Sequence, residues 1–233
     1  MQLPQYTVLI TGANRGLGLE FSRQYAASGW QVISCCRAPK TASDLNMLAK
    51  SFPQNIQVYA LDVADEAQIK ALALQLKATA IDVLINNAGV YPDSSFGHCN
   101  EHDWLEAFKI NAIAPYQVAE AFVTNVASST LKKIVTLSSK MGSMADNTSG
   151  GSYAYRTSKA AANMMMKSLS IDLKTKGIAC GTLHPGWVQT DMGGPNGLIN
   201  AVTSVSGLRQ VIEELNLDNC GRFITFDGKE IAW

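Results

Sequence analysis

Charged residues are scarce in this 233-residue sequence, and neither sign is in excess: Lys and Arg total 19, Asp and Glu also total 19, and together they form 16% of the chain. A chain without a basic surplus is poorly suited to holding nucleic acid or an anionic membrane. No apolar run is long enough to cross a bilayer. The first residues also lack the basic flank and long apolar core of a signal peptide. We therefore expect a cytoplasmic protein that binds neither nucleic acid nor membrane.

Cysteine is infrequent and shows no pattern. The five cysteines, an odd number, have no repeating spacing, which indicates reduced thiols rather than a disulfide framework. Cys35 and Cys36 are adjacent in a predicted strand, so their side chains should point to opposite faces and serve as packing residues.

The segment HCNEHD, residues 98–103, is the one candidate for metal ligands. His98 and His102 would share a helical face, with Cys99 and Asp103 close by. A surface loop that leads into a helix is the better interpretation, because Asn100 and the acids suit a helix N-terminus and no second ligand cluster is present. We predict no metal site.

Short apolar runs rich in β-branched residues alternate with helical patterns along the whole chain. The runs predict buried strands at 6–11, 31–36, 56–61, 81–86, 133–138, 178–183 and 222–226. Helical patterns begin at Leu17 and Ala64 and cover 101–127 and 153–177. This alternation implies right-handed crossovers and a parallel sheet covered on both faces. We predict a single α/β domain over 1–233, a Rossmann-type doubly wound parallel sheet of about seven strands.

The Gly- and Asn-rich segment 189–204 follows the sixth predicted strand. Ligands of open α/β sheets bind at the carboxyl ends of the strands, where this segment lies. It is therefore predicted to be a mobile loop over a substrate.

The first strand ends in TGANRGLG, which places Gly12, Gly16 and Gly18 at the start of a helix. Glycines permit a tight turn and allow a phosphate to approach backbone N–H groups at the positive end of the helix. The order differs from the common G-x-G-x-x-G fingerprint. By itself it fits a turn without a ligand equally well.

The end of the second strand lacks an acid. Many dinucleotide-binding folds place Asp or Glu there to bind the adenosine ribose hydroxyls. Here Cys36 is followed by Arg37, and Arg15 lies in the glycine turn. Two guanidinium groups would bind a ribose 2′-phosphate, which an acid would repel. The pair favours NADP over NAD.

Tyr155 and Lys159 are four residues apart in a predicted helix and share one face. The pair alone fits a solvated helix surface. A nearby ammonium would, however, lower the pKa of the phenol from its usual value near 10 and prepare it for proton transfer.

Taken together, these motifs resemble the short-chain dehydrogenase/reductase family over nearly the full chain. The family's glycine pattern is similar to TGANRGLG, and its N-N-A-G segment to residues 86–89. Its serine, tyrosine and lysine match LSSKMG and YRTSK, and its P-G segment matches HPGWVQTDM. Within the family, the sequence looks like the small carbonyl-reductase-like and C-factor-like branch.

The resemblance implies an NADP(H)-dependent oxidoreductase that reduces an aldehyde or ketone to an alcohol, or the reverse, by hydride transfer. Tyr155 would be the proton donor, Ser139 would stabilise the reacting oxygen, Lys159 would also hold the nicotinamide ribose, and Asn111 would position a water. Ser138 and Ser143 remain alternatives for the serine, because the gap to the tyrosine is longer than usual in the family. The implied cofactor-binding residues are Gly12, Asn14, Arg15, Gly16, Leu17, Gly18, Arg37, Asp62, Val63, Asn87, Ala88, Gly89, Tyr155, Lys159, Pro185, Gly186, Val188 and Thr190.

A rival hypothesis is an NADP(H)-binding sensor or C-factor-like signalling protein with little turnover. The complete serine, tyrosine and lysine set favours the enzyme and a small carbonyl or alcohol substrate. The substrate would contact Tyr91, Pro92, residues 140–151, Trp187 and the loop near 193. The family also leads us to expect a homodimer or homotetramer through the helices at 104–126 and 155–173, although core packing explains their apolar residues equally well.

Overall fold

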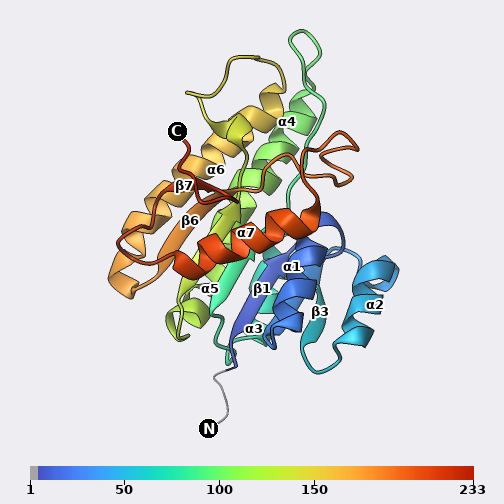
Figure 1. Ribbon diagram of the computed structural model, residues 1–233, viewed down its shortest axis with the longest axis vertical. Helices are drawn as coiled ribbons and strands as arrows, with labels where there is room; N and C mark the ends of the chain where they lie inside the picture. The colour runs from blue at the N-terminus through green and yellow to red at the C-terminus, as the bar shows by residue number, and fades with distance from the viewer. Residues whose placement is uncertain (1–4) are drawn as a thin grey trace.

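Seven parallel strands form one sheet in the order β3-β2-β1-β4-β5-β6-β7 (Figure 1). The sequence predicted every strand to within two residues at each end. The order reverses between β1 and β4, which is the point where open α/β sheets bind ligands. The strands are β1 (Thr7–Thr11), β2 (Gln31–Cys36), β3 (Ile56–Ala60), β4 (Val83–Asn86), β5 (Lys133–Leu137), β6 (Ala179–His184) and β7 (Phe223–Thr225).

The computed structural model describes residues 5–233. Part of the N-terminal segment used for the signal-peptide expectation, residues 1–4, lies outside this range. Within it, none of the helices combines the length and apolar character needed to cross a membrane.

Within residues 5–233, seven α-helices cover the two faces of the sheet. They are α1 (Gly16–Ala27), α2 (Ser43–Ser51), α3 (Glu66–Gln75), α4 (Glu101–Phe108), α5 (Ala114–Ala127), α6 (Tyr153–Asp172) and α7 (Ala201–Glu214). Shorter turns are the 3₁₀ helices Pro39–Thr41, Lys140–Gly142 and Lys174–Lys176, and a π-helical turn, Lys109–Ile113, that joins α4 to α5. At the start of α4, the Asn100 side chain accepts a hydrogen bond from the His102 N–H at 2.9 Å, which confirms the predicted helix N-terminus.

Helix α7 corrects the predicted loop at 189–204, because the helix already begins at Ala201. Its Val, Thr, Ser and Gly residues lower intrinsic helix propensity, although its buried apolar residues recur at helical spacing. Two interactions outweigh that propensity. The Asn200 side chain accepts from the Thr203 N–H at 2.8 Å, and Val205 and Leu208 pack fully buried against the sheet.

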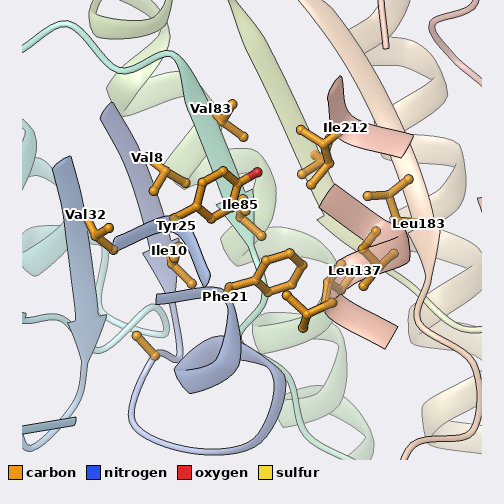
Figure 2. Packing of buried hydrophobic residues seen from close by; sticks show 14 of the residues in the cluster. Val8, Ile10, Phe21, Tyr25, Val32, Val83, Ile85, Leu137, Leu183 and Ile212 are labelled. Atoms are coloured by element: carbon orange, nitrogen blue, oxygen red, sulfur yellow. The ribbon is translucent and has the colours of Figure 1, made fainter. Parts of the chain in front are cut away.

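Alternating residues of each strand point into two separate hydrophobic cores, one on each face of the sheet. Val8 and Ile10 face α1, α2 and α7, whereas Leu9 faces α3, α5 and α6. Figure 2 shows Phe21 and Tyr25 of α1 in the first core, among residues from the central strands. Cys35 and Cys36 fall in opposite cores, as predicted.

Buried polar side chains close the amino edge of the sheet. The Asp82 carboxylate accepts from the backbone N–H groups of Thr7, Thr130 and Leu131 at 2.9–3.1 Å. The Lys133 ammonium donates to two carbonyls at the carboxyl end of α7, each at 2.8 Å. Positive charge is favourable at that end of a helix, so Lys133 acts as a cap.

Candidate active site

A cavity of about 470 Å³ lies at the carboxyl ends of the central strands. It is bounded by the turns after β1, β2, β3 and β4, by α6, and by the loop after β6. A more open hollow of about 990 Å³ between α3 and the α4–α5 segment contains none of the predicted site residues, so we place the site in the smaller cavity. The predicted residues that line it are Gly12, Asn14, Arg15, Gly16, Leu17, Arg37, Asp62, Val63, Asn87, Ala88, Gly89, Tyr155, Lys159, Pro185 and Thr190.

The glycine turn makes a close contact with the turn after β4. Gly12 has φ of +66°, a left-handed conformation, and a Cβ atom there would lie 2.9 Å from Ala88 Cα. The Asn87 side chain donates to the carbonyls of Thr11 at 2.8 Å and Gly12 at 3.0 Å. A larger residue at position 12 would separate these two turns, so the glycine shapes the cavity.

Three predicted cofactor-binding residues lie behind the cavity wall and do not line it. Gly18 is buried, and a Cβ atom there would lie 2.6 Å from Asn87 Nδ2, so it lets α1 approach the sheet closely. Gly186 has φ of +85° and packs against Ile199 and Phe226. Val188 is also buried. Gly18 and Gly186 therefore shape the turns, because a side chain at either position would meet neighbouring chain.

The two arginines that were predicted to bind a ribose phosphate both line the cavity and are both exposed. Arg37 has no hydrogen bond or ion pair with its side chain among residues 5–233. Arg15 forms an ion pair with Asp191 of the loop after β6, Nη1 to Oδ2 at 3.0 Å. No local sequence pattern indicates this ion pair, because 176 residues separate its partners.

Tyr155 and Lys159 are buried on one face of α6, 8% and 5% exposed. The Lys159 ammonium lies 5.7 Å from the centre of the Tyr155 ring and donates to the Leu137 carbonyl at 2.8 Å. It is also close to Gly89, where a Cβ atom would lie 3.6 Å from Nζ. The solvated-surface alternative for the pair is therefore wrong.

The direction of the pKa shift at Tyr155 differs from the prediction. Burial raises the pKa of Tyr155 to about 12, although a side-chain hydrogen bond with Ser139 acts in the opposite direction. Burial also lowers the pKa of Lys159 to about 8. The expectation that Lys159 lowers the pKa of the phenol is thus not met, because desolvation disfavours the charged form of each group and is the largest influence on each pKa.

The three candidate serines have different partners. Ser138 Oγ donates to Asn163 Oδ1 at 2.5 Å, and Ser143 Oγ donates to the Ala232 carbonyl at 2.6 Å. Ser139 Oγ accepts from the Met141 N–H at 3.2 Å and, of the three serines, is the one that acts to lower the pKa of Tyr155. Because Ser138 and Ser143 each donate to a protein acceptor, Ser139 is the better candidate for the hydroxyl next to the phenol.

Asn111 lies in the π-helical turn Lys109–Ile113, so the long predicted helix is interrupted at this residue. π-Helical turns often occur at functional sites. The Asn111 side chain exchanges hydrogen bonds with the Val90 backbone, both at 2.9 Å, and donates to Ser158 Oγ at 3.0 Å. Both N–H donors of its amide are therefore committed to protein acceptors, and the side chain fixes the turn after β4 beside Lys159.

Two further residues of the site were missed or only partly predicted. The Tyr91 ring, expected only as a substrate contact, packs edge-on against the Tyr155 ring at 4.4 Å, and its hydroxyl bonds to Ser152 Oγ at 2.7 Å. His184 ends β6, and its Nδ1 accepts from the Lys140 N–H at 3.2 Å. Burial lowers the pKa of His184 to about 4, so the ring is neutral and can accept that bond. The sequence feature that could have identified His184 is its position directly after the apolar run 178–183, which places it at the carboxyl edge of the sheet.

Comparisons of the sequence with known proteins identify one family. The short chain dehydrogenase family model matches residues 6–213, and the chain belongs to this family of oxidoreductases. Among curated relatives, the C-signal protein of Myxococcus xanthus is 43% identical over 166 residues, which cover 71% of this chain and all of that protein.

Solved structures show the same similarity. The NADPH-bound carbonyl reductase from chicken fatty liver has a TM-score of 0.93 at 36% identity, with 99% of this chain and 100% of that chain covered. The carbonyl reductase Sniffer of Drosophila melanogaster has a TM-score of 0.92 at 34% identity with the same coverage. The motifs assigned by resemblance thus correspond to a family match along most of the sequence.

Proposed function

We propose that this protein is an NADPH-dependent reductase of aldehydes or ketones in which Tyr155 is the proton donor. One observation carries the proposal. A buried phenol lies beside a buried ammonium and a serine at a nucleotide-sized cavity whose other end carries Arg15 and Arg37. The carbonyl reductases with similar structures support the choice of reaction.

The residues present fit a phosphorylated dinucleotide. The glycine turn brings backbone close to the cavity at the start of α1, where N–H groups can bind a diphosphate. Arg37 follows β2, which is where such folds bind the adenosine ribose, and it is free to accept a 2′-phosphate. When bound, NADPH would supply the hydride.

Tyr155 and Ser139 would act on the carbonyl oxygen of the substrate, whereas Lys159 and Asn111 would support cofactor binding and the return of a proton to Tyr155. Tyr155 would donate its phenolic proton to that oxygen as negative charge develops on it. Ser139 would donate a hydrogen bond to the same oxygen. Lys159 would hold the nicotinamide ribose. The N–H donors of the Asn111 side chain already bond to protein groups. A water that connects Lys159 to solvent would therefore be held by the main-chain carbonyl of Asn111, in the π-helical turn.

The raised pKa of Tyr155 supports the reductive direction. With a pKa of about 12 the phenol is protonated at neutral pH, which is the state that a proton donor requires. Alcohol oxidation would require the phenolate as a base. We therefore expect oxidation to increase with pH well into the alkaline range, while reduction remains active at neutral pH.

The test is to screen aldehydes and ketones for loss of NADPH absorbance and then compare two variants in single turnovers with the best compound. Tyr155→Phe should leave NADPH affinity almost unchanged and slow turnover by about 10²–10⁴-fold. Tyr153→Phe is the matched control, because it makes the same change in the first turn of the same helix on a residue that does not line the cavity. A wild-type single-turnover rate in Tyr155→Phe would overturn the assignment of the proton donor.

A signalling function is the second candidate, and the similarity to the Myxococcus xanthus C-signal protein favours it. A signalling protein that only binds the cofactor would reduce none of the compounds at a useful rate. Its output would also survive Tyr155→Phe. We further propose assembly into a dimer or tetramer through α5 and α6, which sedimentation at micromolar concentration would test.

A further inference from the structure

Asp191 is an acidic residue in a place where the proposed cofactor would bring further negative charge. It lines the same cavity as Arg15 and Arg37, and its carboxylate holds the Arg15 guanidinium at 3.0 Å. Neither side chain of the pair is shielded, with 65% of Arg15 and 73% of Asp191 exposed. The Asp191 carboxylate therefore already pairs with Arg15, one of the two guanidinium groups that could bind a ribose phosphate.

The loop that carries Asp191 is held in place by its own hydrogen bonds. The Gln189 N–H donates to the Ile199 carbonyl at 2.9 Å, and the Gly194 N–H donates to the Thr190 carbonyl at 2.8 Å. The loop also approaches the glycine turn, since a Cβ atom at Gly16 would lie 3.5 Å from the Thr190 methyl group. Asp191 thus reaches Arg15 from an ordered turn that covers this part of the cavity.

We propose that Asp191 is a cofactor-specificity residue that competes with the 2′-phosphate of NADPH for Arg15. Binding the phosphate requires Arg15 to leave Asp191 or to be shared with it, and the carboxylate repels the phosphate in either case. NADH carries no 2′-phosphate and meets no such competition. Asp191 therefore weakens NADPH binding selectively and limits the preference that Arg15 and Arg37 create. The inference depends on the proposed use of NADP(H).

The test compares Asp191→Asn with wild type in fluorescence titrations of NADPH and NADH. The variant should bind NADPH about three- to fivefold more tightly, the upper range for loss of an exposed ion pair. NADH affinity should remain unchanged. Adenosine 2′,5′-bisphosphate should show the same gain as NADPH, and AMP should show none. High salt should reduce the gain, because both charges are exposed.

Glu66→Gln is the matched control. It removes one negative charge from another exposed ion pair, with Lys70, and Glu66 does not line the cavity. It should change neither affinity. In an Arg15→Ala background, the gain from Asp191→Asn should decrease, because the two effects depend on the same pair.

Two results would overturn the inference: a ratio of NADH to NADPH Kd that is unchanged in Asp191→Asn, which includes an equal gain for both cofactors, or the same NADPH gain in Glu66→Gln. The proposed cofactor is judged separately, by the wild-type ratio. If wild type bound both cofactors equally, the proposed NADPH dependence would fail. A selective gain in NADPH affinity in Asp191→Asn would still support the proposal that Asp191 competes with the 2′-phosphate for Arg15.

Discussion

Lys133 at the amino edge of the sheet and Lys159 at its carboxyl edge are both buried, 8% and 5% exposed, yet their surroundings differ. Lys133 donates to two carbonyls at the end of α7. Lys159 donates to one, that of Leu137. Burial lowers the pKa of both lysines, and that of Lys159 falls to about 8. An ammonium with one acceptor retains donors for a ligand, at the expense of a larger desolvation penalty.

The same contrast extends to the acids and hydroxyls. At the amino edge, Asp82 accepts three backbone N–H groups and leaves little capacity for a ligand. At the carboxyl edge, Tyr155 and Lys159 line a cavity. The difference indicates that Asp82 and Lys133 at the amino edge stabilise the fold, whereas Tyr155 and Lys159 at the carboxyl edge are retained for binding and chemistry. The predictions below test this division.

The largest expected effect separates two adjacent serines. Ser139→Ala should slow carbonyl reduction by about 10²–10³-fold, as expected when a donor to a developing oxyanion is lost. Its free energy of unfolding should change little. Ser138→Ala should do the reverse and lower the free energy of unfolding by about 1 kcal/mol, because it removes a buried hydrogen bond to Asn163. Single-turnover kinetics measure the rates and urea denaturation measures the free energies of unfolding. A larger rate loss in Ser138→Ala than in Ser139→Ala would show that the assignment of Ser139 is wrong.

At the amino edge, Asp82→Ala should lower the free energy of unfolding by about 3 kcal/mol, because three backbone N–H groups lose an ionised acceptor. NADPH affinity and turnover of the folded fraction should be unchanged. Asp82→Asn retains an acceptor and should lose less. Denaturation curves combined with NADPH titration test this, and a primary defect in turnover would show that the two edges are not independent.

Arg37→Ala should weaken NADPH binding by about 1.5–3 kcal/mol, the range for a hydrogen bond to a charged group, and should leave NADH binding unchanged. Arg37 has no protein partner among the described residues, so its loss should not affect stability. Lys40→Ala is a suitable control, because it removes a neighbouring exposed cation that does not line the cavity. Equal losses for both cofactors in titrations would argue against a phosphate contact.

Much of the fold could be predicted from the sequence, because strand-forming runs and helical patterns alternate along the whole chain. The helices α2 and α7 were missed: α2 is short and has one buried residue, Leu45, and the Ser, Thr and Gly residues of α7 obscure the helical spacing of the apolar residues that it packs into the first core. Most predicted site residues line one cavity, because the motifs lie at the ends of neighbouring parallel strands. The Arg15–Asp191 pair and the pKa of Tyr155 depend on distant contacts and burial, which the local sequence does not specify.

The most direct test of the division between the two edges compares Lys159→Met and Lys133→Met by urea denaturation at several pH values. Between its folded pKa of about 8 and its unfolded value of 10.5, Lys159 binds fewer protons in the native state, so its contribution to stability rises with pH there. Below that range the penalty for burying the ammonium is fully present. Lys159→Met should therefore raise the free energy of unfolding at pH 7 by on the order of 2 kcal/mol while carbonyl reduction is lost.

The gain should decrease as the pH approaches 10, because the wild-type ammonium then becomes neutral on folding at little penalty. Lys133→Met should instead lower the free energy of unfolding at pH 7, because it leaves two carbonyls of α7 without their donor, and it should leave turnover unchanged. If Lys159→Met were less stable than wild type at pH 7, with no dependence of the difference on pH, the account of the carboxyl edge would be wrong.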